Sequence, residues 1–294
     1  MHYFISAFVM GSIYALMALA INIVYSVTGI NNFSHAIVIT AGASVSYYCF
    51  AIFGFPYIGA LLAGIVVTAI INILIYKACV EKLGNLATNL GWITTTFGAS
   101  ILLENILRMV FGTEPQVYPY MFGGKMINIF GAEIMIHEFL ILAIAIVVGV
   151  SYETLMQKTR FGRAVRAVAF KPDIARLMGV RSDLIVTICF AIAGAIAAVA
   201  GSLIAPITFV TYTMTAFIGL KGFAAALIGG LGNSKGAFIG GLILGLIEAL
   251  VGMYGPAALK NAFSFAVMII VVIFLPGGIL GAKIFTKQSS AQKI

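Results

Sequence analysis

The hydrophobicity pattern of the chain is a series of long apolar runs separated by short polar or glycine-containing segments. Each run is close to the roughly 20 residues that a helix needs to cross a bilayer. Backbone groups inside lipid must be satisfied within the segment, which favours helices and excludes open mixed α/β structure. The pattern predicts an all-α polytopic membrane protein with about nine transmembrane helices, within a range of roughly eight to ten. The runs lie at residues 3–27, 33–53, 57–77, 88–111, 137–156, 184–205, 212–231, 236–254 and 262–282.

The second and seventh runs are interrupted by Gly residues, joined in the second run by Ser residues and preceded there by Asn31 and Asn32. Such residues weaken a continuous helix, and non-helical backbone is tolerated at membrane depth where protein surrounds it. The sequence therefore predicts broken or re-entrant segments at these two places.

Composition excludes a soluble domain. Hydrophobic residues make up 62% of the chain and charged residues only 9%, whereas a soluble domain carries roughly 25% charged residues. In a soluble protein the net charge of +8 would suggest a nucleic-acid partner. Here the basic residues lie mainly in the predicted loops, so retention of those loops on the cytoplasmic side explains them, and no nucleic-acid partner is predicted.

The distribution of basic residues predicts the orientation. Segment 157–182 is the most basic and is placed inside, as are the lysines of the C-terminal tail and those at 77 and 82. Segment 112–136 has Lys125 as its only basic residue and is placed outside. These anchors predict an N-terminus outside and a C-terminus in the cytoplasm.

A faint internal repeat suggests how the single membrane domain, residues 1–294, is organised. Residues 58–65 read IGALLAGI and residues 239–246 read IGGLILGL. The match places the third run on the eighth, and these two run in opposite directions in the predicted topology. The chain is then divided into a first repeat (1–136), a linking helix with a cytoplasmic loop (137–183) and a second repeat (184–294). Inverted repeats of this kind are typical of transporters, although short small-residue patterns also recur by chance in membrane proteins.

The segment from Tyr152 to Asp183 holds seven of the 17 Lys and Arg residues of the chain. Within it Phe161, Val165 and Val168 recur at helical spacing, and Arg163 and Arg166 share another face. Pro172 followed by Asp173 suits the first turn of a second helix, which Gly179 would end. Two short helices broken at Pro172 are therefore predicted. The segment is either a topology signal that contacts anionic lipid or a docking element for a cytoplasmic partner.

Several polar residues fall inside the apolar runs, where such groups are costly and face protein or water. Lys221 and Glu248 form either a structural pair, or separate side chains that extend to the interfaces, or part of a translocation path. Asn32 and His35, beside Asn31 and Ser34, either support a broken helix or line the path.

No catalytic or metal-binding chemistry is predicted. The stretch GGLGNSKG at 229–236 lacks the order and the strand–helix context of a phosphate-binding loop, and is interpreted as an inside turn between packed helices. The three Cys residues have no metal-like spacing. The chain is predicted to be a non-enzymatic subunit that binds no cofactor.

The segment GRAVRAVAFKPDIARLMGV resembles the cytoplasmic loop of the branched-chain amino-acid ABC transporter permease family, LivH type. GSIYALMALAINIVYSVTGINNFSHA near the start and GLKGFAAALIGGLGNSKGAFIGGLILGLIEAL and FLPGGILG near the end are similar to the same family. The resemblance covers most of the chain.

The resemblance implies a permease subunit in the inner membrane of a bacterium or archaeon that conducts amino acids, with branched-chain amino acids favoured. Urea, short amides and other small polar solutes remain alternatives, and a self-sufficient carrier or channel is an alternative of another class. The implied partners are two ATPase subunits that bind ATP and Mg²⁺, a second homologous permease, an extracytoplasmic binding protein and membrane lipid. The residues implied for ATPase coupling are Phe161, Gly162, Arg163, Arg166, Pro172, Asp173, Ala175 and Gly179. The candidates for the path are Asn32, His35, Lys221 and Glu248.

Overall fold

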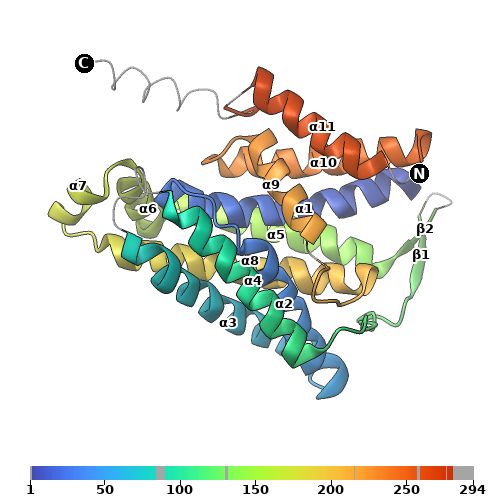
Figure 1. Ribbon diagram of the computed structural model, residues 1–294. Helices are drawn as coiled ribbons and strands as arrows, with labels where there is room; N and C mark the ends of the chain where they lie inside the picture. The colour runs from blue at the N-terminus through green and yellow to red at the C-terminus, as the bar shows by residue number, and fades with distance from the viewer. Residues whose placement is uncertain are drawn as a thin grey trace. The chain divides into compact units, whose positions relative to one another are not determined.

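The computed structural model describes residues 2–83, 90–129, 132–214, 216–256, 259–275 and 277–280. These residues are mainly helical, as Figure 1 shows. The long helices are α1 (His2–Thr28), α2 (His35–Tyr47), α3 (Tyr57–Ile75), α4 (Gly91–Phe111), α5 (Ile136–Lys158), α8 (Ser182–Thr208) and α10 (Ser234–Tyr254). The shorter ones are α6 (Arg160–Phe170), α7 (Pro172–Leu177), α9 (Ala216–Gly229) and α11 (Leu259–Phe274), together with the π-helical turns η1 (Tyr48–Ile52) and η2 (Tyr76–Val80) and the 3₁₀ turn η3 (Glu81–Leu83).

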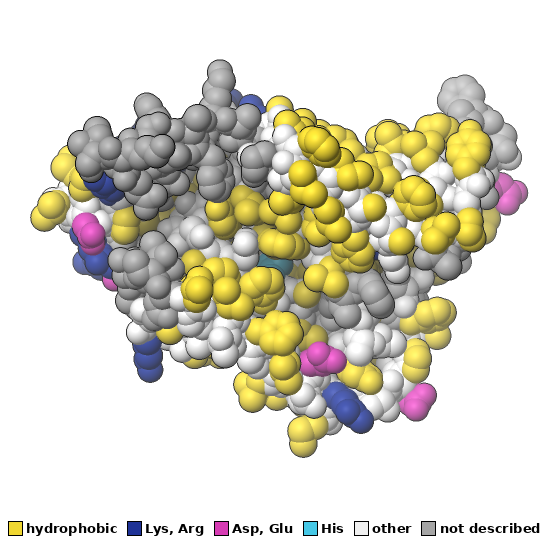
Figure 2. Space-filling model, turned by 45° about the horizontal axis from the view of Figure 1, so that its top comes forward, with side chains coloured by type: hydrophobic (Ala, Val, Ile, Leu, Met, Phe, Trp, Pro, Cys, Tyr) yellow, Lys and Arg dark blue, Asp and Glu magenta, His cyan; other side chains and the backbone are white. Residues whose placement is uncertain are grey.

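The helices confirm the predicted all-α membrane class. A helix lies at each of the nine predicted apolar runs, and 6 of the described helices are long and apolar enough to cross a membrane. On the face shown in Figure 2, hydrophobic side chains predominate and charged ones are few. Helices α9 and α11 are shorter and α4 is not among the six, so the count of nine crossings remains a prediction.

The two interrupted runs have different structures. In the second run the helix is continuous from His35 to Ile52, and the expected irregularity is a change from α- to π-helical winding at Tyr48. Ser34 precedes the helix, while Gly42, Ser44 and Ser46 lie inside it without breaking it. In the seventh run, α9 has only 14 residues, about 21 Å of helix, which is less than the roughly 30 Å hydrocarbon core of a bilayer.

The described chain forms two compact units, neither of which is continuous in sequence. One unit comprises residues 1–22, 122–150 and 220–294, and the other comprises residues 23–121 and 151–219. The division into two repeats and a linking segment remains a prediction.

In the first unit, α1 packs closely against α10. A side chain on Gly241 would collide with the backbone of Ala15, and one on Gly245 would collide with the backbone at Ala7 and Gly11. Small residues at such contacts let two helices approach to backbone distance, which is how membrane helices gain packing energy in lipid. Gly241 and Gly245 of α10 therefore pack against α1.

A short β-hairpin in the same unit was not predicted from the sequence. Strands β1 (Met126–Ile129) and β2 (Ala132–Met135) pair antiparallel, with Met126 opposite Met135. The hairpin lies in segment 112–136, where the apolar pattern was too short to indicate anything but a loop.

In the second unit, α8 packs against α2 and α3 through small residues. A side chain on Gly201 would collide with the Ile39 carbonyl of α2, and one on Gly194 would contact the Thr68 carbonyl of α3 at 2.5 Å. Asn72 Nδ2 of α3 donates a 3.0 Å hydrogen bond to the Phe190 carbonyl of α8. Because these contacts involve backbone, the three helices form a tightly packed core.

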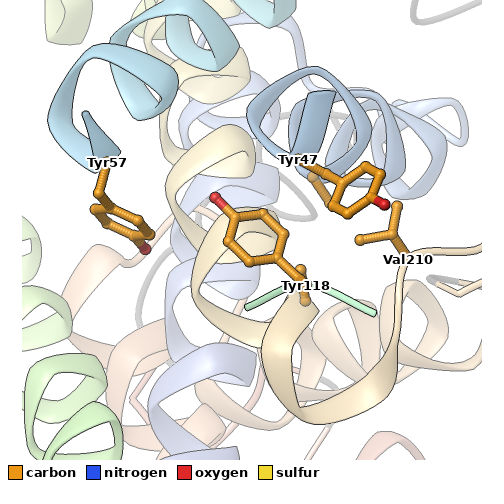
Figure 3. Packing of buried hydrophobic residues seen from close by; sticks show 6 residues of the cluster. Tyr47, Tyr57, Tyr118 and Val210 are labelled. Atoms are coloured by element: carbon orange, nitrogen blue, oxygen red, sulfur yellow. The ribbon is translucent and has the colours of Figure 1, made fainter. Parts of the chain in front are cut away.

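An aromatic cluster closes the end of this unit where α2 finishes and α3 begins (Figure 3). Tyr118, from the connection after α4, is 1% exposed and packs with Tyr47, Tyr57 and Val210. Its hydroxyl lies 2.8 Å from Ser46 Oγ. Gln116 forms a two-way backbone bridge with Val210, at N···O distances of 3.0 and 2.9 Å, so the connections at 112–121 and 209–214 are held together.

Tyr118→Phe should lower the free energy of unfolding at neutral pH by about 1 kcal/mol, because the hydrogen bond to Ser46 is lost. Burial raises the pKa of Tyr118 above its usual value, so the folded protein favours the neutral phenol. Wild-type stability should therefore decrease as pH rises past about 10, where the unfolded chain ionises first, and this loss should be smaller in the variant. Thermal unfolding in nanodiscs at pH 7 and about 10.5 measures both effects. Tyr254→Phe, at a position that is 82% exposed, is the control; an equal effect there would contradict the prediction.

Candidate translocation and coupling sites

The basic segment folds as two short helices with the predicted break. Thr159 precedes α6, and its hydroxyl accepts a 3.1 Å hydrogen bond from Gly162 N, so it caps the helix. Helix α6 ends at Phe170, and α7 begins at Pro172 as expected for a residue with fixed φ and no N–H. Gly179 adopts a φ of 81°, which favours glycine and ends the second helix.

Several residues predicted for ATPase coupling hold this segment against its own unit. A side chain on Gly162 would collide with the Met156 carbonyl at the end of α5, and Arg166 Nη1 donates a hydrogen bond to that same carbonyl. Val165, Val168 and Ala175 are buried. These residues fix the corner between α5 and α6, so their contacts are internal, and their role in coupling remains a prediction.

Other apolar side chains of the segment are exposed, because nothing in the described unit covers them. We call Phe170, Ile174, Leu177 and Met178 the apolar tip; their exposed fractions are 82%, 49%, 87% and 80%. Arg176 lies beside the tip and binds Asp173 at 3.6 Å and Asp183 at 3.0 Å, which ties α7 to the start of α8. Arg163 is exposed on α6. An exposed apolar group on an ordered helix with charged neighbours is typical of a protein-binding surface.

Lys221 and Glu248 lie together in the first unit as a direct ion pair. Lys221 Nζ is 2.7 Å from Glu248 Oε1, and the residues are 9% and 7% exposed. The Tyr14 hydroxyl of α1 donates to Glu248 Oε2 at 2.7 Å, and the Ser264 hydroxyl of α11 donates to Oε1 at 2.6 Å. We call these four residues the buried ion network; it joins α1, α9, α10 and α11.

The sequence left three alternatives for Lys221 and Glu248. The structure agrees with the first, a structural pair, because both charges are buried and neither extends to an interface. Glu248 accepts three hydrogen bonds, and Lys221 also contacts the Tyr14 hydroxyl at 3.4 Å. Sequence reasoning did not find Tyr14 or Ser264 as partners. Their polar groups inside apolar runs were the available signal, but pairing them with Glu248 required the packing of four helices.

The turn after α9 is organised by another polar residue that the sequence interpretation missed. Asn22 of α1 accepts a 2.8 Å hydrogen bond from Gly232 N and donates to the carbonyls of Gly230 and Asn233. Asn233 caps α10 by accepting from Gly236 N at 3.2 Å. The stretch GGLGNSKG is therefore a tight turn between packed helices, as predicted.

Asn32 and His35 lie at the N-terminus of α2 in the second unit. Asn32 Oδ1 accepts hydrogen bonds from Ser34 N at 3.1 Å and from the Ser34 hydroxyl at 2.6 Å. Asn32 Nδ2 and both ring nitrogens of His35 are buried without a hydrogen-bond partner, and the two residues are 7% and 2% exposed. Buried polar groups in native proteins usually have a partner, so these atoms are candidates to bind water or a ligand.

Comparison with known proteins decides the family. The family model described as "Branched-chain amino acid transport system / permease component" matches residues 3–272. The chain belongs to this family. The match spans nearly all the described helices, so the permease is a multi-pass membrane protein and a transport subunit.

Individual relatives agree along almost their whole length. The permease is 33% identical over 284 residues to the high-affinity branched-chain amino acid transport system permease protein LivH of Salmonella typhimurium, covering 92% of each chain. It is 29% identical over 292 residues to the corresponding protein BraD of Pseudomonas aeruginosa, covering 94% of each. The probable branched-chain amino acid transport permease protein LivH of Methanocaldococcus jannaschii is 26% identical, and the match covers 94% of this chain and 90% of the relative.

Proposed function

We propose that the permease is the membrane subunit of an ATP-driven importer and forms the translocation path for branched-chain amino acids. The observation that carries this proposal is the family match over residues 3–272, together with relatives described as branched-chain amino acid permeases. Inner-membrane location, with the N-terminus outside and the C-terminus in the cytoplasm, follows from the distribution of basic residues and is part of the proposal.

The proposed assembly contains two cytoplasmic ATPases, a second homologous permease and an extracytoplasmic substrate-binding protein. ATP and Mg²⁺ bind to the ATPases, and this chain carries no cofactor. Family membership supports the ATPase and binding-protein partners. The second permease is proposed because the resemblance implies a pair of membrane subunits.

The apolar tip is the proposed contact with an ATPase. Four exposed apolar side chains on and beside a short helix match a partner groove that is apolar inside and charged at its rim. Arg176 lies beside Leu177 in α7, and Arg163 is exposed on α6; both could supply charge for such a rim. Gly162, Arg166 and Ala175 act behind this surface, because their contacts hold α6 and α7 in place. Closure of the ATPases on ATP would then move the helix pair as a rigid body.

The test is import by a complex purified with its native partners and reconstituted in liposomes. Leucine, isoleucine or valine should be imported with ATP and the binding protein, and not when ATP is withheld. Import of urea or acetamide but of no amino acid would assign the permease to another substrate class. Uptake by the purified chain alone, without an ATPase, would contradict the importer proposal and favour a self-sufficient carrier or channel.

A further inference from the structure

The N-terminus of α2 combines a helix end with buried polar atoms that have no partner. Asn32 Nδ2 can donate, His35 can donate from one ring nitrogen and accept at the other, and Asn31 Oδ1 can accept. All four atoms are buried. Leaving a buried polar group unpaired is costly, so a cluster of such groups points to a ligand or water that binds there.

A second helix begins at the same place. Gly219, in the first turn of α9, lies in the same compact unit as α2, and a side chain on it would collide with Ala36 Cβ in the first turn of α2. The first turns of α2 and α9 are therefore in contact. Each helix N-terminus carries a partial positive charge, equivalent to roughly half an elementary charge.

No acidic residue offsets these two positive ends. Neither α2 nor α9 has an acidic residue in its first turn. Ser34 stands at the capping position of α2 but makes no side-chain cap; Asn32 Oδ1, a neutral acceptor, receives the Ser34 N–H and the Ser34 hydroxyl. Two helix N-termini without a carboxylate, beside unpaired donors, form an environment that favours an anion.

We propose that Asn32 Nδ2, His35 and the touching N-termini of α2 and α9 bind the α-carboxylate of the amino acid during its passage. This inference rests on the proposed function and deepens it, since it names the group of the substrate that the permease recognises. The remaining acceptors, Asn31 Oδ1 and one nitrogen of His35, suit the α-ammonium group. The site recognises the backbone common to all amino acids, so it leaves the choice among side chains to other parts of the importer.

The buried ion network does not compete for this role. Glu248 already accepts from Lys221, Tyr14 and Ser264, and Lys221 is held at 2.7 Å from that carboxylate. A substrate carboxylate there would have to displace an existing partner. At Asn32 and His35 it would satisfy atoms that otherwise have none.

The first experiment separates binding from folding at His35. His35→Phe removes both ring nitrogens and keeps a similar size, whereas His35→Gln keeps one donor and one acceptor. In the reconstituted complex with saturating binding protein, His35→Phe should lower the leucine imported per ATP hydrolysed by roughly tenfold or more, the effect of losing one hydrogen bond to a charged group. His35→Gln should restore much of the coupling. The Tm of His35→Phe should equal or exceed that of the wild type, because an unpaired buried group has been removed.

Ser46→Ala is the matched control, because Ser46 is buried on the same helix α2 and its hydroxyl is already paired with the Tyr118 hydroxyl at 2.8 Å. This variant should lower Tm and leave the leucine-to-ATP ratio unchanged. If His35→Phe behaves like Ser46→Ala, with reduced Tm and normal coupling, His35 supports the fold through water or protein and the proposal is wrong.

The second experiment tests the preference for an anion without any substrate. Asp and Asn differ in charge but hardly in size, so Ser34→Asp and Ser34→Asn place a charged and a neutral group at the same capping position. If the two N-termini attract an anion, Ser34→Asp should have the higher Tm and should block leucine import. A lower Tm for Ser34→Asp than for Ser34→Asn would overturn the anion site. Because this comparison needs no transport, its failure is distinguishable from a wild-type complex that imports no leucine, which would refute the proposed function instead.

Discussion

Glu248→Leu is expected to lower the free energy of unfolding by about 3–5 kcal/mol, the usual cost of breaking a buried ion pair from one side. The substitution leaves the Lys221 ammonium 9% exposed among apolar helices without its carboxylate. Tyr14 and Ser264 lose the acceptor of their hydrogen bonds at the same time. Denaturant or thermal unfolding of the permease in nanodiscs measures the loss.

The matched control is the double variant Lys221→Met with Glu248→Leu. Replacing both members of a buried pair with apolar residues of similar volume is often neutral or stabilising, so this variant should recover much of the lost stability. A double variant as unstable as Glu248→Leu would show that Lys221 is not the group left uncompensated. Tyr14→Phe should cost less, about 1.5–3 kcal/mol, since a hydrogen bond to a charged group is removed but the ion pair remains.

The second large effect is expected at the apolar tip. Leu177→Glu with Met178→Glu should weaken binding of the ATPase roughly hundredfold or more, because it places two charges where the partner would have to bury them. Both side chains are at least four-fifths exposed in the described structure, at 87% and 80%, so the fold should tolerate the change. Co-purification of the ATPase from detergent extracts measures the loss, and leucine uptake should disappear with it.

Two controls separate docking from folding. Val117→Glu alters an apolar residue that is 68% exposed, on the connection predicted to lie outside, and should leave ATPase binding unchanged. Arg166→Glu should instead lower thermal stability, because Arg166 holds the Met156 carbonyl at the corner of α5 and α6. Normal amounts of ATPase bound to the Leu177 and Met178 double variant would refute the proposed docking surface.

The basic segment illustrates how far local sequence rules extend. Its two helices, the break at Pro172 and the end at Gly179 could be predicted because a fixed φ, a missing N–H and a positive φ are properties of single residues. Which side chains of the segment are exposed could not be predicted in the same way. Gly162 and Arg166 turned out to contact α5, and the apolar tip includes Phe170 and Leu177, which sequence reasoning had not selected.

The polar residues inside the apolar runs show the same limit. Sequence marked Lys221 and Glu248 as notable, because charge is rare and costly at membrane depth. It left three alternatives open, since spacing along one chain says nothing about which helices become neighbours. The partners Tyr14 and Ser264 lie on α1 and α11, which are more than 200 residues apart in sequence. Tyr14 itself is 234 residues from Glu248.

The sequence by itself determined the membrane class, the positions of the helices, the basic segment and the family. These follow from hydrophobic length, charge distribution and motifs, all of which are local or additive along the chain. Only the tertiary structure decided that Lys221 pairs with Glu248, that the first turns of α2 and α9 meet, and that Asn32 and His35 have no partner. The physical reason is that hydrogen bonds and ion pairs between helices depend on distances of about 3 Å, which are set by the packing of distant segments.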